Sequence, residues 1–145
     1  MAGMSAADWA FWDTWMRAQR VLVRELDQGL QRDCGISKAE FSVLMTLGRP
    51  MRVGELADAL DWEKSRVSHL LTRMENRGLV ARIEDGATGR RTGVELTAEG
   101  RRTAERATRA HGGNVRRLVL DQLSPGQATA IREWAEQLIE RAERG

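Results

Sequence analysis

Cysteine, proline and tyrosine are scarce in this chain of 145 residues, which contains one cysteine, two prolines and no tyrosine. A single cysteine excludes an internal disulfide and is typical of a protein in a reducing compartment. The chain also lacks an apolar run of the roughly 18 residues that a membrane span needs. Its N-terminus lacks the basic start and apolar stretch of a signal peptide. We therefore expect a cytoplasmic protein that makes no membrane contact.

Lysine is also scarce, because only Lys38 and Lys64 are lysines among 23 basic residues, which leaves 21 arginines. Arginine binds phosphate and base edges well. The codons of a GC-rich genome produce the same bias, and the net charge is only +2, so composition points weakly to polyanions. With 30% charged and 41% hydrophobic residues, the chain is typical of a folded protein. Its length favours a single domain over residues 1–145.

The first half of the chain has the apolar spacing of helices. A long helix is predicted over residues 5–33, with Ser5 and Asp8 at its cap. Ser37 and Glu40 form the pattern of a capping box before a short helix that stops at Gly48. Residues 49–53 are predicted to be an extended link, because a proline disfavours helix at the preceding residue.

Two short helices are predicted next, over residues 54–60 and 63–77, with Asp61 as a cap for the second. The inward side of the second helix is apolar and comprises Val67, Leu70, Leu71 and Met74. Residues 79–84 and 91–96 then alternate as strands around the turn sequence 85–90, which predicts a two-stranded hairpin.

Two further helices complete the chain. Thr97 is predicted to cap an arginine-rich helix that reaches about Leu120. Ser124 and Gln127 form another capping box around Pro125, at the start of a last helix. The apolar stripe of that helix contains Ile131, Trp134, Ala135, Leu138 and Ala142.

This order predicts a mainly α fold with a small β-hairpin, in which residues 37–96 form a winged helix-turn-helix. The helices at 5–33 and 97–143 are longer than that module needs, and their stripes are rich in Trp, Leu and Val. These stripes need a partner surface, and a second copy of the chain is the simplest one. We therefore expect dimerisation helices and a homodimer.

The outward side of the helix at 63–77 carries candidate DNA contacts. The second helix of a helix-turn-helix is narrow enough to enter the major groove, where base edges differ. Arg66 can pair with guanine, Arg73 is placed to clamp a phosphate, and the helix start favours phosphate through its backbone amides. The hairpin tip ends in two arginines, which suit the negative potential of a minor groove. The candidate contacts are Trp62, Lys64, Ser65, Arg66, Ser68, His69, Arg73, Arg90 and Arg91. A solvated amphipathic helix and a solvated turn are the alternatives.

Catalytic and metal chemistry find no support in the sequence. Ser65 and His69 face the same way, but nothing supplies an orienting acid or an oxyanion hole. His69 and His111 with one cysteine do not make a metal cluster. We therefore expect no enzyme activity, no metal and no cofactor.

The segments "GELADAL", "KSRVSHLLTRMENRGLVARIED" and "GRRTGVELTAEG" resemble the MarR (multiple antibiotic resistance regulator) family of bacterial transcription factors. The resemblance covers nearly the whole chain, and assigns these segments to the supporting helix, the recognition helix and the wing. It implies recognition-helix contacts at Ser65, Arg66, Ser68, His69 and Arg73, and a wing arginine at Arg90. Thr88 stands where the family often has an acid that orients this arginine, and the link before "MRVGELADAL" is shorter than usual.

The resemblance also implies a small aromatic or phenolic anion as effector, bound between the dimerisation helices and the winged module. Trp12, Trp15, Arg17 and Arg20 could stack on such an anion and neutralise it, although tryptophans at helical spacing are more often core or interface. Cys34 is interpreted as an ordinary thiol rather than a redox sensor, because no nearby residue would activate or resolve it.

The expected function is therefore that of a dimeric, ligand-responsive regulator that binds a pseudo-palindromic operator in double-stranded DNA. Repression is expected rather than activation, because occupying a promoter is sufficient for it. Its recognition helices would enter major grooves and its wings minor grooves. The alternative from another class is a helical interaction module that binds no DNA.

Overall fold

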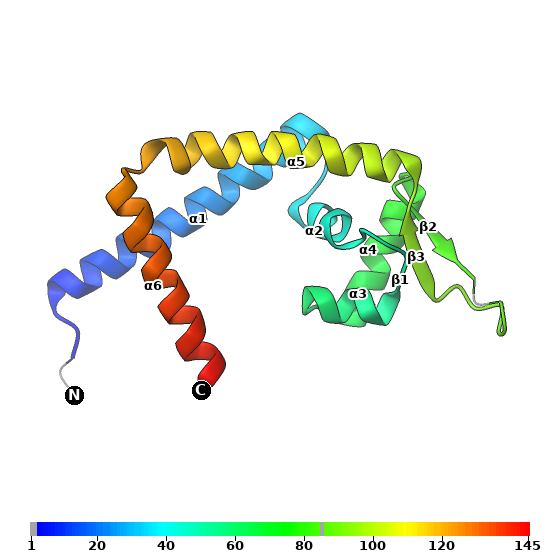
Figure 1. Ribbon diagram of the computed structural model, residues 1–145, viewed down its shortest axis with the longest axis horizontal. Coiled ribbons are helices and arrows are strands. Elements are labelled where there is room, and N and C mark those ends of the chain that lie inside the picture. Colours follow the sequence, from blue (N-terminus) through cyan, green and yellow to red (C-terminus); the bar gives the residue numbers. More distant parts are fainter. Residues whose placement is uncertain (1–2, 85) are drawn as a thin grey trace. The chain divides into compact units, whose positions relative to one another are not determined.

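The computed structural model describes residues 3–84 and 86–145 of the chain. Six α-helices, three strands and one 3-10 helix follow one another in this part (Figure 1). They are α1 (Ala6–Cys34), α2 (Lys38–Thr46), β1 (Met51–Arg52), α3 (Val53–Leu60), α4 (Lys64–Asn76), β2 (Val80–Ile83), β3 (Gly93–Leu96), α5 (Ala98–Leu118), η1 (Leu120–Gln122) and α6 (Pro125–Arg144). The mainly α fold class predicted from the sequence is confirmed.

The chain divides into two compact units, one that ends at His111 and one that comprises residues 112–145. The first unit contains the helix-turn-helix and the sheet. The second contains the end of α5, η1 and α6. Whether residues 1–145 behave as a single domain stays a prediction. No helix in the described ranges has the length and apolarity to cross a membrane.

The sheet is antiparallel and has the order β1-β3-β2. Val80 of β2 lies opposite Leu96 of β3, and Met51 of β1 lies opposite Val94. The hairpin predicted from the sequence is therefore present, and part of the extended link forms β1, the third strand of the sheet. Val53 continues this pairing by donating its N–H to the carbonyl of Thr92 at 3.0 Å. The wing, which comprises β2, β3 and the loop between them, is thereby joined to the start of α3.

The hydrophobic core lies within the winged module, because its helices and strands each present one apolar face inward. The fully buried side chains include Ile36, Leu47, Leu56, Val67, Leu71, Met74, Val80 and Val94. The four residues predicted to face inward on α4 are all 3% exposed or less. From the long helices, Leu30 of α1 and Ala107 of α5 join the same core.

Helix caps fix where the chain changes direction. The side chains of Ser5, Ser37 and Ser124 accept hydrogen bonds from the third residue of their helices, as predicted. The hydroxyl and then the N–H of Ser5 hold the pKa of the Asp8 carboxyl below its ordinary value.

The predicted cap at Asp61 is wrong. Asp61 has a left-handed backbone with φ of 55°, ends α3, and donates its N–H back to the Asp58 carbonyl at 3.1 Å. Glu63 occupies the N-cap of α4, and its side chain makes no cap hydrogen bond within the described residues. Asp61 therefore ends α3 in the tight turn and is not available to cap α4.

Gly100 is required where α5 begins. A Cβ at this position would overlap the backbone carbonyl of Leu79, which cannot move like a flexible side chain. Overpacking of this kind destabilises proteins by about 1–3 kcal/mol. We expect Gly100→Ala to lower the free energy of unfolding by about that amount in urea denaturation. Gly112→Ala is the matched control in the same helix, since its Cβ would meet open space. An equal loss in both variants would contradict the packing argument.

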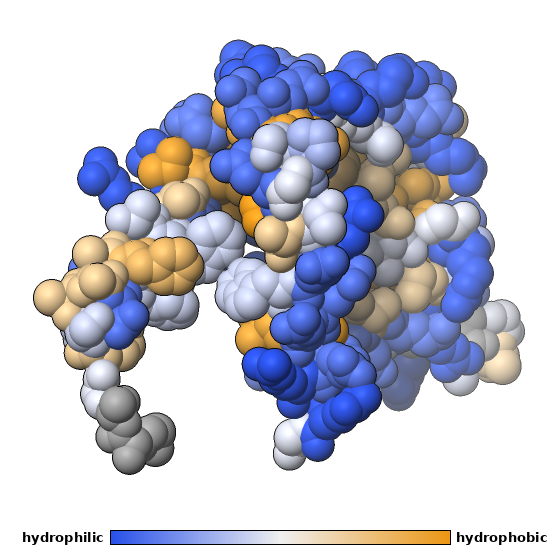
Figure 2. Space-filling view, turned by 60° about the vertical axis from the view of Figure 1, so that its left-hand side comes forward, coloured by the Kyte–Doolittle hydropathy of each residue, from blue (hydrophilic) through white to orange (hydrophobic). Residues whose placement is uncertain are grey.

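Large apolar side chains remain exposed on the long helices. On α1 they include Trp9, Phe11 and Trp12, and on α6 they include Ile131, Trp134, Leu138 and Ile139. Figure 2 shows apolar side chains reaching the surface between charged ones. Scattered single apolar residues are normal on a surface, but a stripe that follows one helix side needs a cover.

Candidate nucleic-acid interface

The candidate interface is built on α4, whose buried side fixes which residues face outward. With Val67, Leu71 and Met74 fully buried, the opposite side of the helix is set by the helical period. Lys64, Ser65, Arg66, His69 and Arg73 are exposed, and Ser68 is half-buried. The structure therefore brings the predicted contacts of α4 onto one accessible side. Because Glu63 does not cap the helix, the first-turn amides are available to an anion.

Arg66 is held by Trp62. The guanidinium carbon of Arg66 lies 4.2 Å from the centre of the Trp62 ring, within the range of a cation–π contact. Trp62 is half-buried and packs against the core. This contact restricts a long side chain that would otherwise sample many rotamers, and it leaves the donor fork of Arg66 exposed.

Two arginines connect the wing to α4, and sequence reasoning missed both connections. Arg82 of β2 donates to the backbone carbonyl of Ser68 and to the hydroxyl of Thr72, each at 3.3 Å. Arg91 forms an ion pair with Glu75. The only sequence signal for these contacts was the outward position of Arg82 in an alternating strand. The wing is thus attached to the helix at two points.

Arg91 was predicted to bind DNA, and the structure gives its guanidinium a protein partner. The ion pair with Glu75 leaves Arg91 exposed but oriented towards α4. In this structure the ion pair attaches the base of the wing loop to Glu75 of α4. Contact with DNA stays a prediction for this residue.

The tip of the wing carries Arg90 on a turn that Thr88 stabilises. The N–H of Arg90 donates to the Thr88 hydroxyl at 3.3 Å, and Gly89 has a φ of 69°, which favours glycine. A hydroxyl therefore closes the turn where the family often has an acid. Arg90 is exposed, and Figure 1 shows the loop extending beyond the helices of its unit. Asp85, part of the predicted turn, lies outside the described residues.

This geometry agrees with three comparisons. The MarR family model matches residues 35–91. The crystal structure of Sco3205 from Streptomyces coelicolor, a MarR family regulator in complex with DNA, is 30% identical with a TM-score of 0.82. It covers 97% of this chain and 90% of that one. The chain belongs to the MarR family.

Other MarR regulators support the same assignment. AbsC from Streptomyces coelicolor is 28% identical over the full length of both chains, with a TM-score of 0.82. The transcriptional regulator HosA from Escherichia coli O127:H6 is 37% identical over 67 residues, which are 45% of this chain and 50% of HosA. The match therefore spans half the length of that relative. The MarR family comprises transcriptional regulators, in agreement with the prediction that the chain is not an enzyme.

The four predicted effector residues lie on α1. Trp12 is 44% exposed, Arg17 and Arg20 are exposed, and Trp15 is half-buried. Arg20 lines a shallow hollow on α1 with Met16. A more enclosed cavity of about 260 Å³ lies among α1, α2 and α5, and none of the four lines it.

The walls of that cavity combine apolar and polar groups, and they include Leu26, Leu30, Asp27, Lys38, Phe41 and His111. The Phe41 and His111 rings are in contact, with their centroids 4.8 Å apart and their planes inclined by 44°. The Nδ1 atom of His111 is buried and has no hydrogen-bond partner among the described residues. Buried polar atoms are usually bonded, so this nitrogen is placed to meet a ligand or a water molecule.

Cys34 is a free, half-buried thiol at the end of α1 and packs against the core. Its interpretation as an ordinary thiol stays a prediction. Within residues 3–84 and 86–145, no three His, Cys, Asp or Glu side chains are grouped to hold a metal ion.

Proposed function

We propose that the protein is a homodimeric transcriptional regulator that binds a pseudo-palindromic operator in double-stranded DNA. One observation carries this proposal: Arg66, oriented by Trp62 on the exposed side of α4, lies in the same compact unit as the wing arginine Arg90. The attachments of Arg82 and Arg91 to α4 hold this unit together. A winged helix-turn-helix binds DNA with two parts, a helix in the major groove and a wing arginine in the minor groove.

Each exposed residue has a distinct role in this proposal. Arg66 presents two donors to the O6 and N7 atoms of guanine. Ser65, Ser68 and His69 donate to neighbouring bases or phosphates, while Arg73 clamps a phosphate further along. Lys64 and the indole N–H of Trp62 lie near the uncapped start of α4, where a phosphate is favoured.

The dimer follows from the apolar stripes of α1 and α6, which expose Trp12 and Leu138 at 44% and 52%. A second copy of the chain is the simplest cover for these stripes. To read one operator, such a dimer must hold its two recognition helices about 34 Å apart, one turn of DNA. Repression is the simplest outcome, because occupying a promoter is sufficient for it.

A helical interaction module without DNA binding would keep the same stripes but would not need an exposed arginine at the wing tip. We expect Arg90→Ala to weaken DNA binding on all sequences. It should also reduce the slope of log affinity against log salt by about 0.9 for each lost phosphate contact. Fluorescence anisotropy over a salt series measures both quantities. Arg109→Ala, which removes an exposed arginine from α5, should leave the slope unchanged. An unchanged slope for Arg90→Ala would favour the interaction module.

We further propose that an aromatic or phenolic anion binds the cavity among α1, α2 and α5. The Lys38 ammonium supplies the opposite charge, Phe41 supplies a stacking face, and Nδ1 of His111 supplies an unused polar atom. The Asp27 carboxylate on the same wall would repel an anion. It would also accept a hydrogen bond, so it favours an anion that carries a hydroxyl donor.

This effector site is tested by calorimetric titration with a panel of substituted benzoates. We expect Lys38→Met to weaken binding roughly tenfold to a hundredfold, because a charge-assisted hydrogen bond is lost. Arg20→Met should leave binding unchanged. The reverse pattern would instead support the site on α1 that the sequence suggested.

A further inference from the structure

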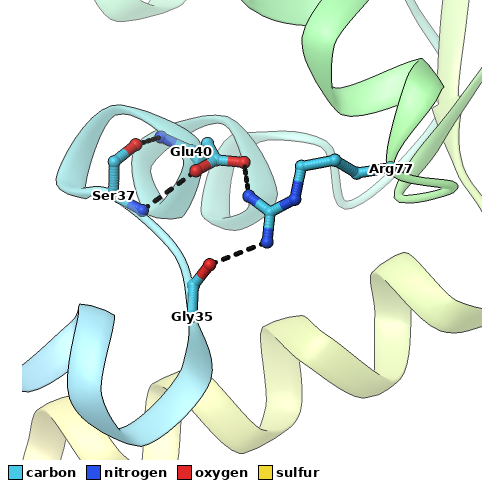
Figure 3. Close-up of polar contacts among 4 residues, drawn as sticks. All are labelled: Gly35, Ser37, Glu40 and Arg77. Atoms are coloured by element: carbon cyan, nitrogen blue, oxygen red, sulfur yellow. Dashed lines mark hydrogen bonds and ion pairs between the residues drawn. The ribbon is translucent and has the colours of Figure 1, made fainter.

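The carboxyl end of α4 is connected to the end of α1 by a single side chain. Arg77, the C-cap residue of α4, forms an ion pair with Glu40 of α2. Its second terminal nitrogen donates to the carbonyl of Gly35 at 2.7 Å (Figure 3). Gly35 is the residue that ends α1. One guanidinium therefore bridges three helices of the first unit.

Both acceptors of this guanidinium are fixed in place. Glu40 is only 8% exposed, and its other carboxylate oxygen accepts the N–H of Ser37 at 3.0 Å. Gly35 has a left-handed backbone, and its N–H is bonded to the Gln31 carbonyl at 2.9 Å. An arginine that binds two immobile acceptors is itself held rigidly, as in other fork-shaped contacts.

The start of α5 holds the same end of α4 from another element. Thr97 donates its hydroxyl to the carbonyl of Gly78 at 2.6 Å and its N–H to the carbonyl of Leu79 at 3.1 Å. Gly100 then packs on Leu79 so closely that a Cβ does not fit. The C-cap of α4 is thus attached to the end of α1, and the two residues that follow it are attached to the beginning of α5.

This attachment lies at the opposite end of α4 from the base-reading residues. The helix has 13 residues, which corresponds to about 20 Å. A tilt of about 5° at one end would displace the other end by roughly 1.7 Å, more than a hydrogen bond tolerates. The orientation of Ser65 and Arg66 therefore depends on how the far end is held.

We propose that Arg77 is a positioning residue that sets the pitch of α4 against the long helices, and thereby sets the half-site spacing that the dimer accepts. Arg77 does not touch DNA in this account. The inference rests on the proposed function, because half-site spacing matters only when two recognition helices bind one operator. Through the contacts of Arg77 with Glu40 and Gly35, the arrangement of the two protomers would determine how far apart the two α4 helices are held on DNA.

The test uses an operator that the unmodified protein enriches from a random duplex library. One to three base pairs are then inserted or removed between its half-sites, and affinity is measured for each spacing and for a single half-site. We expect Arg77→Gln to lower affinity at the native spacing about tenfold and half-site affinity less than threefold. Its preference for the native spacing over a one-base-pair change should also be reduced. Arg106→Gln, a matched loss of an exposed arginine, should keep the spacing preference.

Two more variants separate positioning from folding. Glu40→Gln keeps the shape of the anchor but removes its charge, and Arg77→Lys keeps the charge but cannot span both acceptors. Both should reduce the spacing preference while thermal unfolding still shows a folded dimer. An unchanged spacing preference in the folded variants would overturn the inference. Failure of the unmodified protein to enrich any paired site would instead overturn the proposed function on which the inference rests.

Discussion

Replacing Ile131 and Leu138 together with glutamate is expected to separate the proposed dimer and to lower operator affinity by about a hundredfold or more. These two side chains lie on the apolar stripe of α6 and are 42% and 52% exposed in the single chain. In the proposed interface, two carboxylates on this stripe would have to be desolvated without partners, which is strongly unfavourable. A separated monomer binds one half-site only, so it loses the gain from engaging both sites at once.

Light scattering after size exclusion gives the mass, and anisotropy with a selected operator gives the affinity. Thr129→Glu is the control, since it adds one carboxylate on the opposite side of α6. The control should stay dimeric and bind normally. A double variant that keeps the dimer mass and the wild-type affinity would show that this stripe does not form the interface.

Arg66→Ala is expected to have the second large effect, and to act on sequence discrimination. A bidentate arginine–guanine pair contributes about 1–3 kcal/mol of discrimination. The proposed dimer would use two such pairs, so affinity for the selected operator should fall about thirtyfold or more, with a much smaller loss on scrambled DNA. The stacking of Arg66 on Trp62 supports this size of effect, because the side chain is already oriented before it binds.

Arg66→Lys distinguishes base reading from simple charge. A lysine keeps the positive charge and the salt dependence, but it lacks the planar fork that matches guanine. Anisotropy with the selected operator and with single guanine substitutions should therefore show lost discrimination in both variants. Equal losses on selected and scrambled duplexes would mean that Arg66 contacts phosphate only.

The sequence predicted the elements well where a local rule determines them. The capping boxes at Ser5, Ser37 and Ser124 each need only residues three positions apart. The buried side of α4 follows from the helical period alone. The candidate contacts on α4 were found for the same reason, since the outward side is what the apolar stripe leaves.

The long-range contacts of α4 and the residue that caps it were not predictable from local rules. Arg77 and Glu40 are separated by 37 positions, and Arg91 and Glu75 by 16. With 21 arginines in the chain, no pattern indicates which arginine pairs with which carboxylate. The error at Asp61 has a related cause, because a residue between two helices can end the first or begin the second. Its left-handed backbone decides this and is invisible in the sequence.

Selection from a random duplex library would show whether two copies of this chain bind one DNA site together, as proposed. The purified protein would be equilibrated with the library at moderate salt, and the bound duplexes would be sequenced. We expect enrichment of an inverted repeat whose half-sites are centred about one helical turn apart, or a multiple of it. Bound duplexes with the same sequence distribution as the input, or an enriched site without two-fold symmetry, would contradict it.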